Sequence, residues 1–160
     1  MAAHEDRSIR VRDVMSKQVF TVSPSDTAQS VARLMEEAEV GALPVEAPGV
    51  GTILGIVTER DILASVVAQG LSTSTAVFEF MTVSAEYCEE EDSILLAAQK
   101  MHEFKIRRLV VLDEKKHAAG IISLADITRA SPELGGLVLE GMSRQEPQSH
   151  ALEGASICQA

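Results

Sequence analysis

Apolar and polar positions follow two periods along the chain, and each period predicts one kind of element. Short apolar runs bounded by Pro, Gly or charged residues predict strands, and they cover residues 19–22, 43–45, 53–57, the region near Tyr87, 108–112 and 118–123. Apolar residues three and four positions apart predict helices, which run from a cap at Ser25 or Asp26 to about Glu39, over 59–69, from 92 to about 104, and onward from near Leu124.

The same series of elements occurs twice. Residues 13–62 recur, with substitutions, at residues 79–127. Met15 reappears 66 positions later as Met81, and the offset falls to 65 in the last part of the repeat. A repeat of this length predicts two half-domains that form a pseudo-symmetric pair with two related clefts.

The repeats divide the chain into four parts. We expect an N-terminal tail at residues 1–8, a first repeat at 9–70, a second repeat at 71–130 and a partly flexible extension at 131–160. The Ser- and Thr-rich residues 71–77 are the expected linker. In the extension, helical spacing predicts one short helix from Leu134, Leu137, Val138 and Met142.

Composition and charge exclude several classes of function. The 160 residues are 46% apolar and lack Trp, so we expect a globular domain with an aliphatic core. The net charge of −10, without a basic stripe, argues against nucleic acid and anionic membranes as partners. No apolar run is long enough for a membrane span or a secretory leader, so we expect a cytoplasmic location.

Metal and redox chemistry receive little support from the sequence. Cys88 and Cys158 form neither a CxxC motif nor a metal-ligand spacing. Residues 89–92 are all acidic and stand at an expected helix start, where the helix dipole favours negative charge. A metal site is the weaker explanation of this run, because it lacks ligand spacing. We expect no metal and no required cofactor.

Each repeat carries a hydroxyl and, three positions later, a carboxylate where a strand meets a helix. The pairs are Thr58 with Asp61 and Ser123 with Asp126. Such a pair fits a capping box, which satisfies backbone N–H groups at a helix start. The same turn suits a sugar phosphate, because N–H groups attract phosphate and a carboxylate accepts hydrogen bonds from two ribose hydroxyls. Both interpretations stay open here.

Three arginines offer positive charge near these turns. Arg60 lies inside the first turn, and Arg107 and Arg108 precede a strand of the second repeat. A guanidinium group can bind an anion bidentately, although a solvated surface arginine is an equally simple explanation. Gly41 and Ala42 stand where the second repeat has its two arginines, so the two clefts should differ in affinity.

The ordered motifs of both copies resemble the cystathionine β-synthase (CBS) domain. They occupy residues 11–15, 21–24, 41–45 and 55–61 in the first copy, and 106–111 and 120–126 in the second. The likeness covers roughly residues 9–130 and is greatest to stand-alone bacterial CBS-pair proteins, including the hypoxic-response type. It implies an α/β (α+β) fold of tandem β-α-β-β-α units that form a pseudo-two-fold pair, and it implies a homodimer of such pairs.

The resemblance also implies a ligand and its binding residues. Clefts between CBS units commonly hold AMP, ADP, ATP or S-adenosylmethionine. The residues implied at ribose and phosphate are Thr58, Asp61, Arg108, Ser123 and Asp126. Those implied around the adenine slots are Thr21, Ala42, Tyr87 and Arg108, and Arg60 and Arg107 complete the candidate set.

A regulatory module that senses an adenine nucleotide is therefore the leading expectation, with an unidentified regulated protein as partner. Catalysis is not expected, because none of the histidines has an obvious partner motif. Two alternatives remain. One is a protein–protein interaction module without a ligand, in which both turns only cap helices, and the other is a sensor of S-adenosylmethionine.

Overall fold

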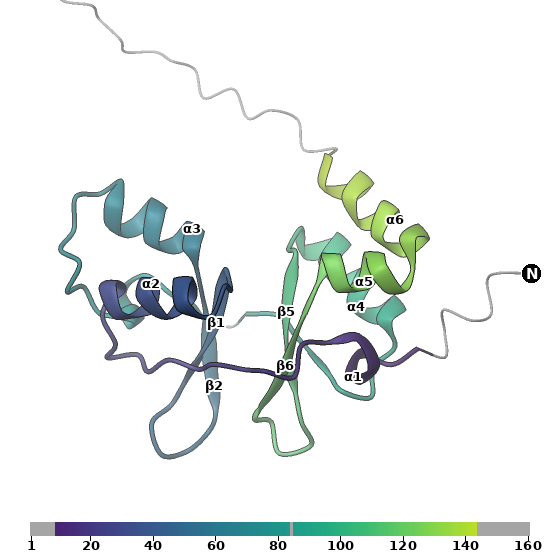
Figure 1. Cartoon of the computed structure of the whole chain (residues 1–160), viewed down its shortest axis with the longest axis horizontal. Helices are drawn as coiled ribbons and strands as arrows, with labels where there is room; N and C mark the ends of the chain where they lie inside the picture. The colour runs from purple at the N-terminus through teal and green to yellow at the C-terminus, as the bar shows by residue number, and fades with distance from the viewer. Residues whose placement is uncertain (1–8, 84, 144–160) are drawn as a thin grey trace, which may run out of the picture.

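Two small sheets lie side by side in the middle of the molecule, with helices on their outer sides (Figure 1). The computed structural model describes residues 9–83 and 85–143. One sheet has the strand order β1-β2-β3 and the other has the order β4-β5-β6. This arrangement confirms the expected α+β fold of two related halves.

The first half contains a helix, a hairpin and a second helix. Its elements are α2 (Ala28–Glu37), β1 (Ala42–Glu46), β2 (Ile53–Thr58) and α3 (Glu59–Asp61), which continues as a π-helix over Ile62–Val67. The extent of this last helix agrees with the predicted 59–69. The hydrophobic spacing did not distinguish its π-helical turns from α-helical ones.

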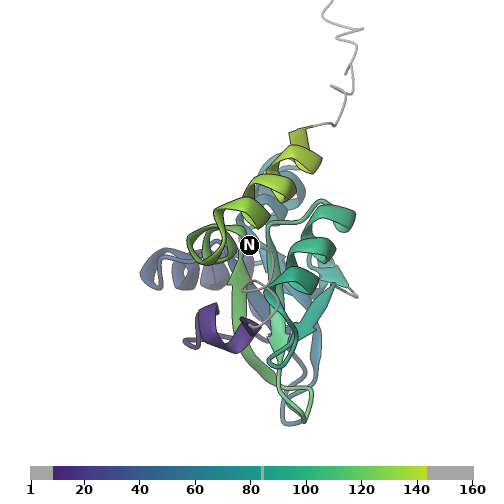
Figure 2. The ribbon, with the colours of Figure 1, turned by 90° about the vertical axis from the view of Figure 1, so that its right-hand side faces the viewer.

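The second half repeats this order and adds a helix. Its elements are β4 (Tyr87–Glu89), α4 (Ile94–Phe104), β5 (Arg108–Leu112), β6 (Ala118–Ser123), α5 (Leu124–Ala130) and α6 (Pro132–Ser143). The bounds of β5 and β6 are those predicted. The short helix predicted in the extension is α6, which packs on α4 and α5 and runs across the outer side of this half (Figure 2). Of its own side chains, Leu134 and Val138 are buried, whereas Leu137 is 59% exposed.

The two central hairpins have the same register, which confirms the duplication at the level of the backbone. Ala42 lies opposite Thr58 in the first hairpin, and Arg108 lies opposite Ser123 in the second. An irregularity in register also falls at the equivalent place in both. Positions 42 and 58 therefore correspond in space to positions 108 and 123.

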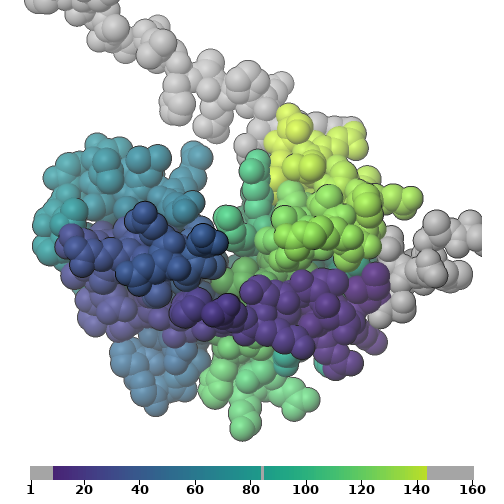
Figure 3. Space-filling view, viewed as in Figure 1, coloured from purple at the N-terminus to yellow at the C-terminus, as the bar shows by residue number. Residues whose placement is uncertain are grey.

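The N-terminal segment of the first repeat packs on the second half. It contains α1 (Val11–Val14), and the side chains of Val11 and Met15 belong to the core of the second half. Ser16 then forms a bridge with Ile121 of β6. In Figures 1 and 3 this purple segment passes from the second half to the first along one face of the molecule.

The corresponding segment of the second repeat, residues 77–83, does the reverse. Val77, in a 3-10 turn (Val77–Glu79), and Phe80 are buried in the core of the first half. β3 (Thr82–Val83) follows and becomes the third strand of the first sheet, with Thr82 opposite Ile56. The two halves are thus joined by a reciprocal exchange of short segments.

Two equivalent glycines make room for the crossing segments. A β-carbon on Gly55 would overlap the carbonyl oxygen of Thr82. A β-carbon on Gly120 would lie 2.6 Å from Sδ of Met15 and 2.7 Å from the carbonyl oxygen of Ser16. Backbones that approach this closely leave no space for a side chain. The glycine at the start of each Gly-Ile motif is therefore required by packing.

The strand expected at residues 19–22 is wrong. Only Val22 forms a bridge, with Val45 of β1. Its N–H donates to the carbonyl of Pro44 at 3.0 Å, and its carbonyl accepts from the N–H of Glu46 at 2.8 Å. Donors alternate along a strand, so the next donor on this side of β1 would belong to position 44. Proline has no N–H, and the ladder ends there.

The expected cap of α2, at Ser25 or Asp26, is also wrong by a residue or two. Thr27 caps the helix by accepting a hydrogen bond from the N–H of Ser30 at 3.1 Å. Asp26 instead accepts from the N–H of Ser23 at 2.8 Å and closes the turn before the helix. Both residue types cap helices, so composition alone does not separate them.

We predict that Gly55→Ala lowers the free energy of unfolding by about 1–3 kcal/mol, the usual cost of overpacking. The added methyl group meets the backbone of β3. Urea denaturation followed by circular dichroism measures the change. Gly136→Ala in α6 is the control, because no described atom lies within 4 Å of its added carbon. Equal stability of the Gly55→Ala variant and the wild type would contradict the close approach.

Candidate functional site

The first hydroxyl–carboxylate pair closes the turn between β2 and α3. Oδ2 of Asp61 accepts hydrogen bonds from the N–H and from Oγ1 of Thr58, both at 2.8 Å. The N–H of Asp61 donates to Oγ1 of Thr58 at 3.2 Å, so both hydrogen bonds of a capping box are present. Oδ1 of Asp61 has no hydrogen-bond partner within residues 9–83 and 85–143. Every buried side-chain oxygen in these ranges has a hydrogen-bond partner. Oδ1 has none, so it is not buried and reaches solvent.

The second pair makes the same box but uses both carboxylate oxygens. Oδ2 of Asp126 accepts from the N–H and Oγ of Ser123 at 2.8 and 2.7 Å, and the N–H of Asp126 donates to Oγ of Ser123 at 3.2 Å. Oδ1 of Asp126 accepts from Nη1 of Arg129 at 2.9 Å. The two repeats therefore share the cap and differ at the second oxygen.

A cleft of about 390 Å³ lies beside the first pair and is lined by both repeats. Thr58 and Asp61 come from the first half, and Arg107 and Arg108 come from the second. These predicted residues meet in one place although they belong to opposite halves. The volume lies within the roughly 300–1,000 Å³ that small-molecule pockets occupy.

Arg107 and Arg108 supply the positive charge of this cleft. Both side chains are exposed, and neither forms an ion pair with another residue of the described ranges. Arg108 reaches toward the first half, because a β-carbon placed on Gly41 would lie 3.0 Å from its Nη2. Two unpaired guanidinium groups near an open carboxylate oxygen suit a ligand that carries both an anion and hydroxyl donors.

Sequence reasoning missed the remaining walls of the cleft. The apolar walls are Ile56, Ala85, Phe104 and Ile106, and the polar ones are Thr82 and Glu86. Phe104 is 45% exposed, which is unusual for a large aromatic side chain at the end of an amphipathic helix. In the sequence, apolar side chains of this kind are indistinguishable from core residues. They line one cleft only because the two halves pack against each other.

The other predicted candidates lie outside this cleft. Ala42 is buried in β1, and Thr21 and Arg60 are exposed residues that do not line it. Ser123 and Asp126 belong to the turn of the second half and are not among its walls either. Four of the ten predicted candidates therefore line this cleft, and six lie elsewhere.

Tyr87 lines a neighbouring cavity of about 300 Å³, which shares Ala85 with the cleft. Nζ of Lys100 donates to the carbonyl of Tyr87 at 2.6 Å and lies 5.5 Å from its ring centroid. Lys116, which pairs with Glu89, lies 5.9 Å from the same centroid. Tyr87 is thus held by two cations of its own half, next to the cleft instead of inside it.

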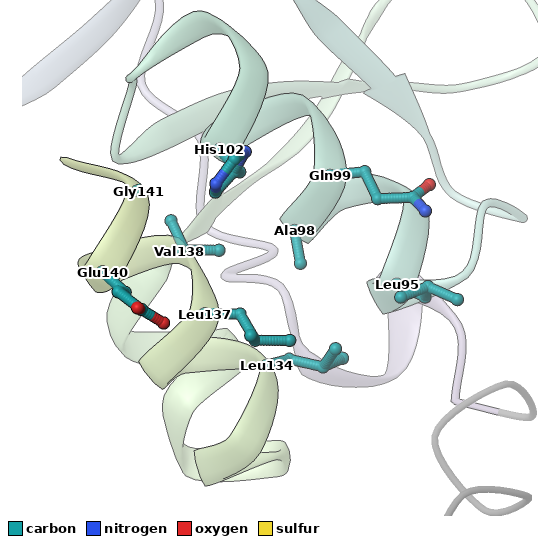
Figure 4. A pocket seen from close by; sticks show the side chains of 9 residues that line it. All are labelled: Leu95, Ala98, Gln99, His102, Leu134, Leu137, Val138, Glu140 and Gly141. Atoms are coloured by element: carbon teal, nitrogen blue, oxygen red, sulfur yellow. The ribbon is translucent and has the colours of Figure 1, made fainter. Parts of the chain in front are cut away.

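A roomier groove of about 460 Å³ separates α4 from α6 (Figure 4). Leu95, Leu134 and Val138 form much of its wall, with His102 and Glu140 at its edge. Its walls contain neither lysine nor arginine. The groove therefore offers apolar surface to a helix or side chain and lacks the charge pattern that recognises a phosphate.

The acidic run at residues 89–92 takes part in ordinary contacts. Glu91 pairs with Arg12, and Glu89 pairs with Lys116. In the part of the chain that the structure describes, no group of three or more potential metal ligands comes together. No helix in that part is long and apolar enough to cross a membrane.

Cys88 of β4 is unsuited to nucleophilic chemistry. Its side chain is fully buried in the core of the second half. Burial, with a smaller contribution from the charge of Asp92, raises the pKa of the Cys88 thiol to about 12. The thiolate is the reactive form, so Cys88 is inert near neutral pH. Cys158 lies outside the described residues.

Comparison with known proteins agrees with the two matched halves. The family model for the CBS domain matches residues 11–68 and again residues 77–133. The chain belongs to the CBS domain family. It is similar to the CBS domain-containing protein YhcV of Bacillus subtilis, with 38% identity over 137 residues, which are 84% of this chain and 96% of YhcV.

Two solved structures of this family contain adenosine compounds. The CBS domain pair of protein MJ0100, in complex with 5′-methylthioadenosine and S-adenosyl-L-methionine, has a TM-score of 0.70 at 25% identity and covers 78% of this chain and 96% of its own. CBSX2 in complex with AMP has a TM-score of 0.66 at 26% identity and covers 79% of this chain and 98% of its own. The resemblance expected from the motifs is confirmed.

We predict that Thr58→Ala lowers the free energy of unfolding by about 1 kcal/mol, the usual cost of losing a helix cap. The variant loses the hydroxyl that the N–H of Asp61 contacts. Thr58→Ser retains the hydroxyl and should unfold close to the wild type in urea. The capping role fails if the Ala and Ser variants have equal stability.

Proposed function

We propose that this CBS-pair protein is a non-catalytic regulatory module that binds an adenine nucleotide in the cleft between its repeats. One observation carries the proposal. The open Oδ1 of Asp61 and the unpaired guanidinium groups of Arg107 and Arg108 line a single cleft of about 390 Å³. These groups complement the hydroxyls and the phosphate of one nucleotide.

The ribose is assigned to Asp61. Its Oδ2 is occupied by Thr58, whereas Oδ1 keeps both lone pairs for two vicinal hydroxyls. The hydroxyl of Thr58 already donates a hydrogen bond to Oδ2 of Asp61. Its role toward the ligand is therefore to hold the carboxylate in position.

The phosphate is assigned to Arg107 and Arg108, and the base to the apolar walls. A guanidinium group binds a phosphate through two parallel hydrogen bonds. Ile56, Phe104 and Ile106 offer a flat apolar base the surface it needs to leave water. The complexes of MJ0100 and CBSX2 support the ligand class by similarity. AMP, ADP, ATP and S-adenosylmethionine stay within that class.

A ligand in this cleft would act on the whole pair. It would contact groups of both halves, so it favours the relative position of the halves in which those groups meet. We propose that this change alters the affinity for a regulated protein partner. Self-association into a homodimer is part of the proposal. Leu63 and Val67, on the π-helix Ile62–Val67, are 62% and 64% exposed and offer apolar surface for such a contact.

A second candidate function is an interaction module without a ligand. The observation in its favour is that both hydroxyl–carboxylate pairs form complete capping boxes. In that case the carboxylate of Asp61 would contribute to stability alone. The two candidates separate when binding and stability are measured on the same variants.

We predict that the wild type binds AMP or another member of the class in isothermal titration calorimetry, and that Asp61→Asn weakens binding at least tenfold. The carboxamide offers one acceptor oxygen in place of two, and the charge-assisted hydrogen bonds are lost. AMP, ADP, ATP and S-adenosylmethionine are titrated in turn. The nucleotide should also raise the melting temperature of the wild type by mass action.

Asp113→Asn is the matched control, since Asp113 accepts backbone hydrogen bonds in the β5–β6 turn and lies outside the cleft. It changes the net charge by the same amount and should bind like the wild type. No heat with any of the four compounds at millimolar concentration would exclude the sensor and leave the ligand-free module.

A further inference from the structure

The turn of the second half is already occupied by the protein itself. Arg129 donates to Oδ1 of Asp126, the oxygen whose counterpart on Asp61 is open. The residue equivalent to Arg129 in the first repeat is Ala64, which is exposed and cannot form such a bond. A guanidinium group in one repeat thus takes the place that the other repeat leaves for a ligand.

The Asp126 turn also lacks an equivalent of the two arginines that line the Asp61 cleft. Positions 41 and 42 correspond to Arg107 and Arg108, and they hold Gly and Ala. The absence of a side chain at Gly41 has a steric cause, because a β-carbon there would lie 3.0 Å from Nη2 of Arg108 and 3.1 Å from Oε2 of Glu59. Arg108 therefore uses the space that an equivalent arginine of the first repeat would need.

A third difference concerns the wall of the cleft. Glu86 lines the Asp61 cleft, and its equivalent in the first repeat is Phe20. Phe20 is partly buried and packs against the core of the first half. The first two differences favour a nucleotide at the Asp61 turn over the Asp126 turn, whereas Glu86 adds a carboxylate to the wall of the Asp61 cleft.

We propose that each chain binds one nucleotide, in the Asp61 cleft, and that Arg129 acts as the internal occupant of the Asp126 turn. This inference rests on the proposed function and assigns its stoichiometry. The pair is duplicated in backbone, yet among residues 9–83 and 85–143 only the Asp61 turn presents an open carboxylate oxygen to two arginines without an ion pair. Ala64 stands at the sequence position of Arg129 and has no group that could bond to this oxygen.

The test transplants the arginine. Ala64→Arg places a guanidinium group three residues after Asp61, as Arg129 stands after Asp126, and Ala64→Gln is the uncharged control of comparable length. Ala64 is exposed, so neither variant disturbs the core. Ala64→Arg should raise the Kd for AMP about fivefold, the effect of one exposed ion pair. Ala64→Gln should stay within about twofold of the wild type.

Calorimetry with AMP also reports the stoichiometry. The expected value is one AMP per chain in the wild type and in Asp126→Asn, with thermal melting as the check that this variant is folded. Two AMP per chain, lost binding in folded Asp126→Asn, or Ala64→Arg no weaker than Ala64→Gln would each overturn the inference while the sensor function stands. No binding of AMP or its relatives by the wild type would overturn both together.

Discussion

The reciprocal exchange of residues 10–16 and 77–83 determines how the two halves lie against each other. Each segment leaves its own repeat and completes the core of the other, so separating the halves would expose Val11 and Val77 to water. The crossing backbone passes so close to each hairpin that glycine is required there. This fixed relation is what brings the turn of Asp61 to the arginines of the opposite half.

Within that frame, the two oxygens of one carboxylate have different surroundings. Oδ2 of Asp61 closes the helix cap, and Oδ1 remains open. A carboxylate has enough lone pairs for both tasks, so the capping and the binding interpretations of the motif do not exclude each other. The repeats differ at equivalent sequence positions, where Arg129 engages this oxygen of Asp126 and Ala64 has no group that could do so.

Local pattern was a good guide wherever hydrogen bonds are local or pair adjacent strands. It predicted β5 and β6 with their observed bounds, because alternating burial and the turn between them are contained in one short stretch. It failed at residues 19–22, where the missing donor belongs to Pro44 of another strand. It also missed α1 and β3, which are too short to persist without the half on which they pack.

The candidate site divides in the same way. The sequence by itself determined the duplication, the two capping turns and the aliphatic cores, since these follow from residue type and short spacing. The tertiary structure decided that Asp61 shares a cleft with Arg107 and Arg108, that Phe104 and Glu86 join its walls, and that Arg129 engages Asp126. The physical reason is that the cleft forms from surfaces of two halves held together by exchanged segments, and no local period along the chain encodes which surfaces meet.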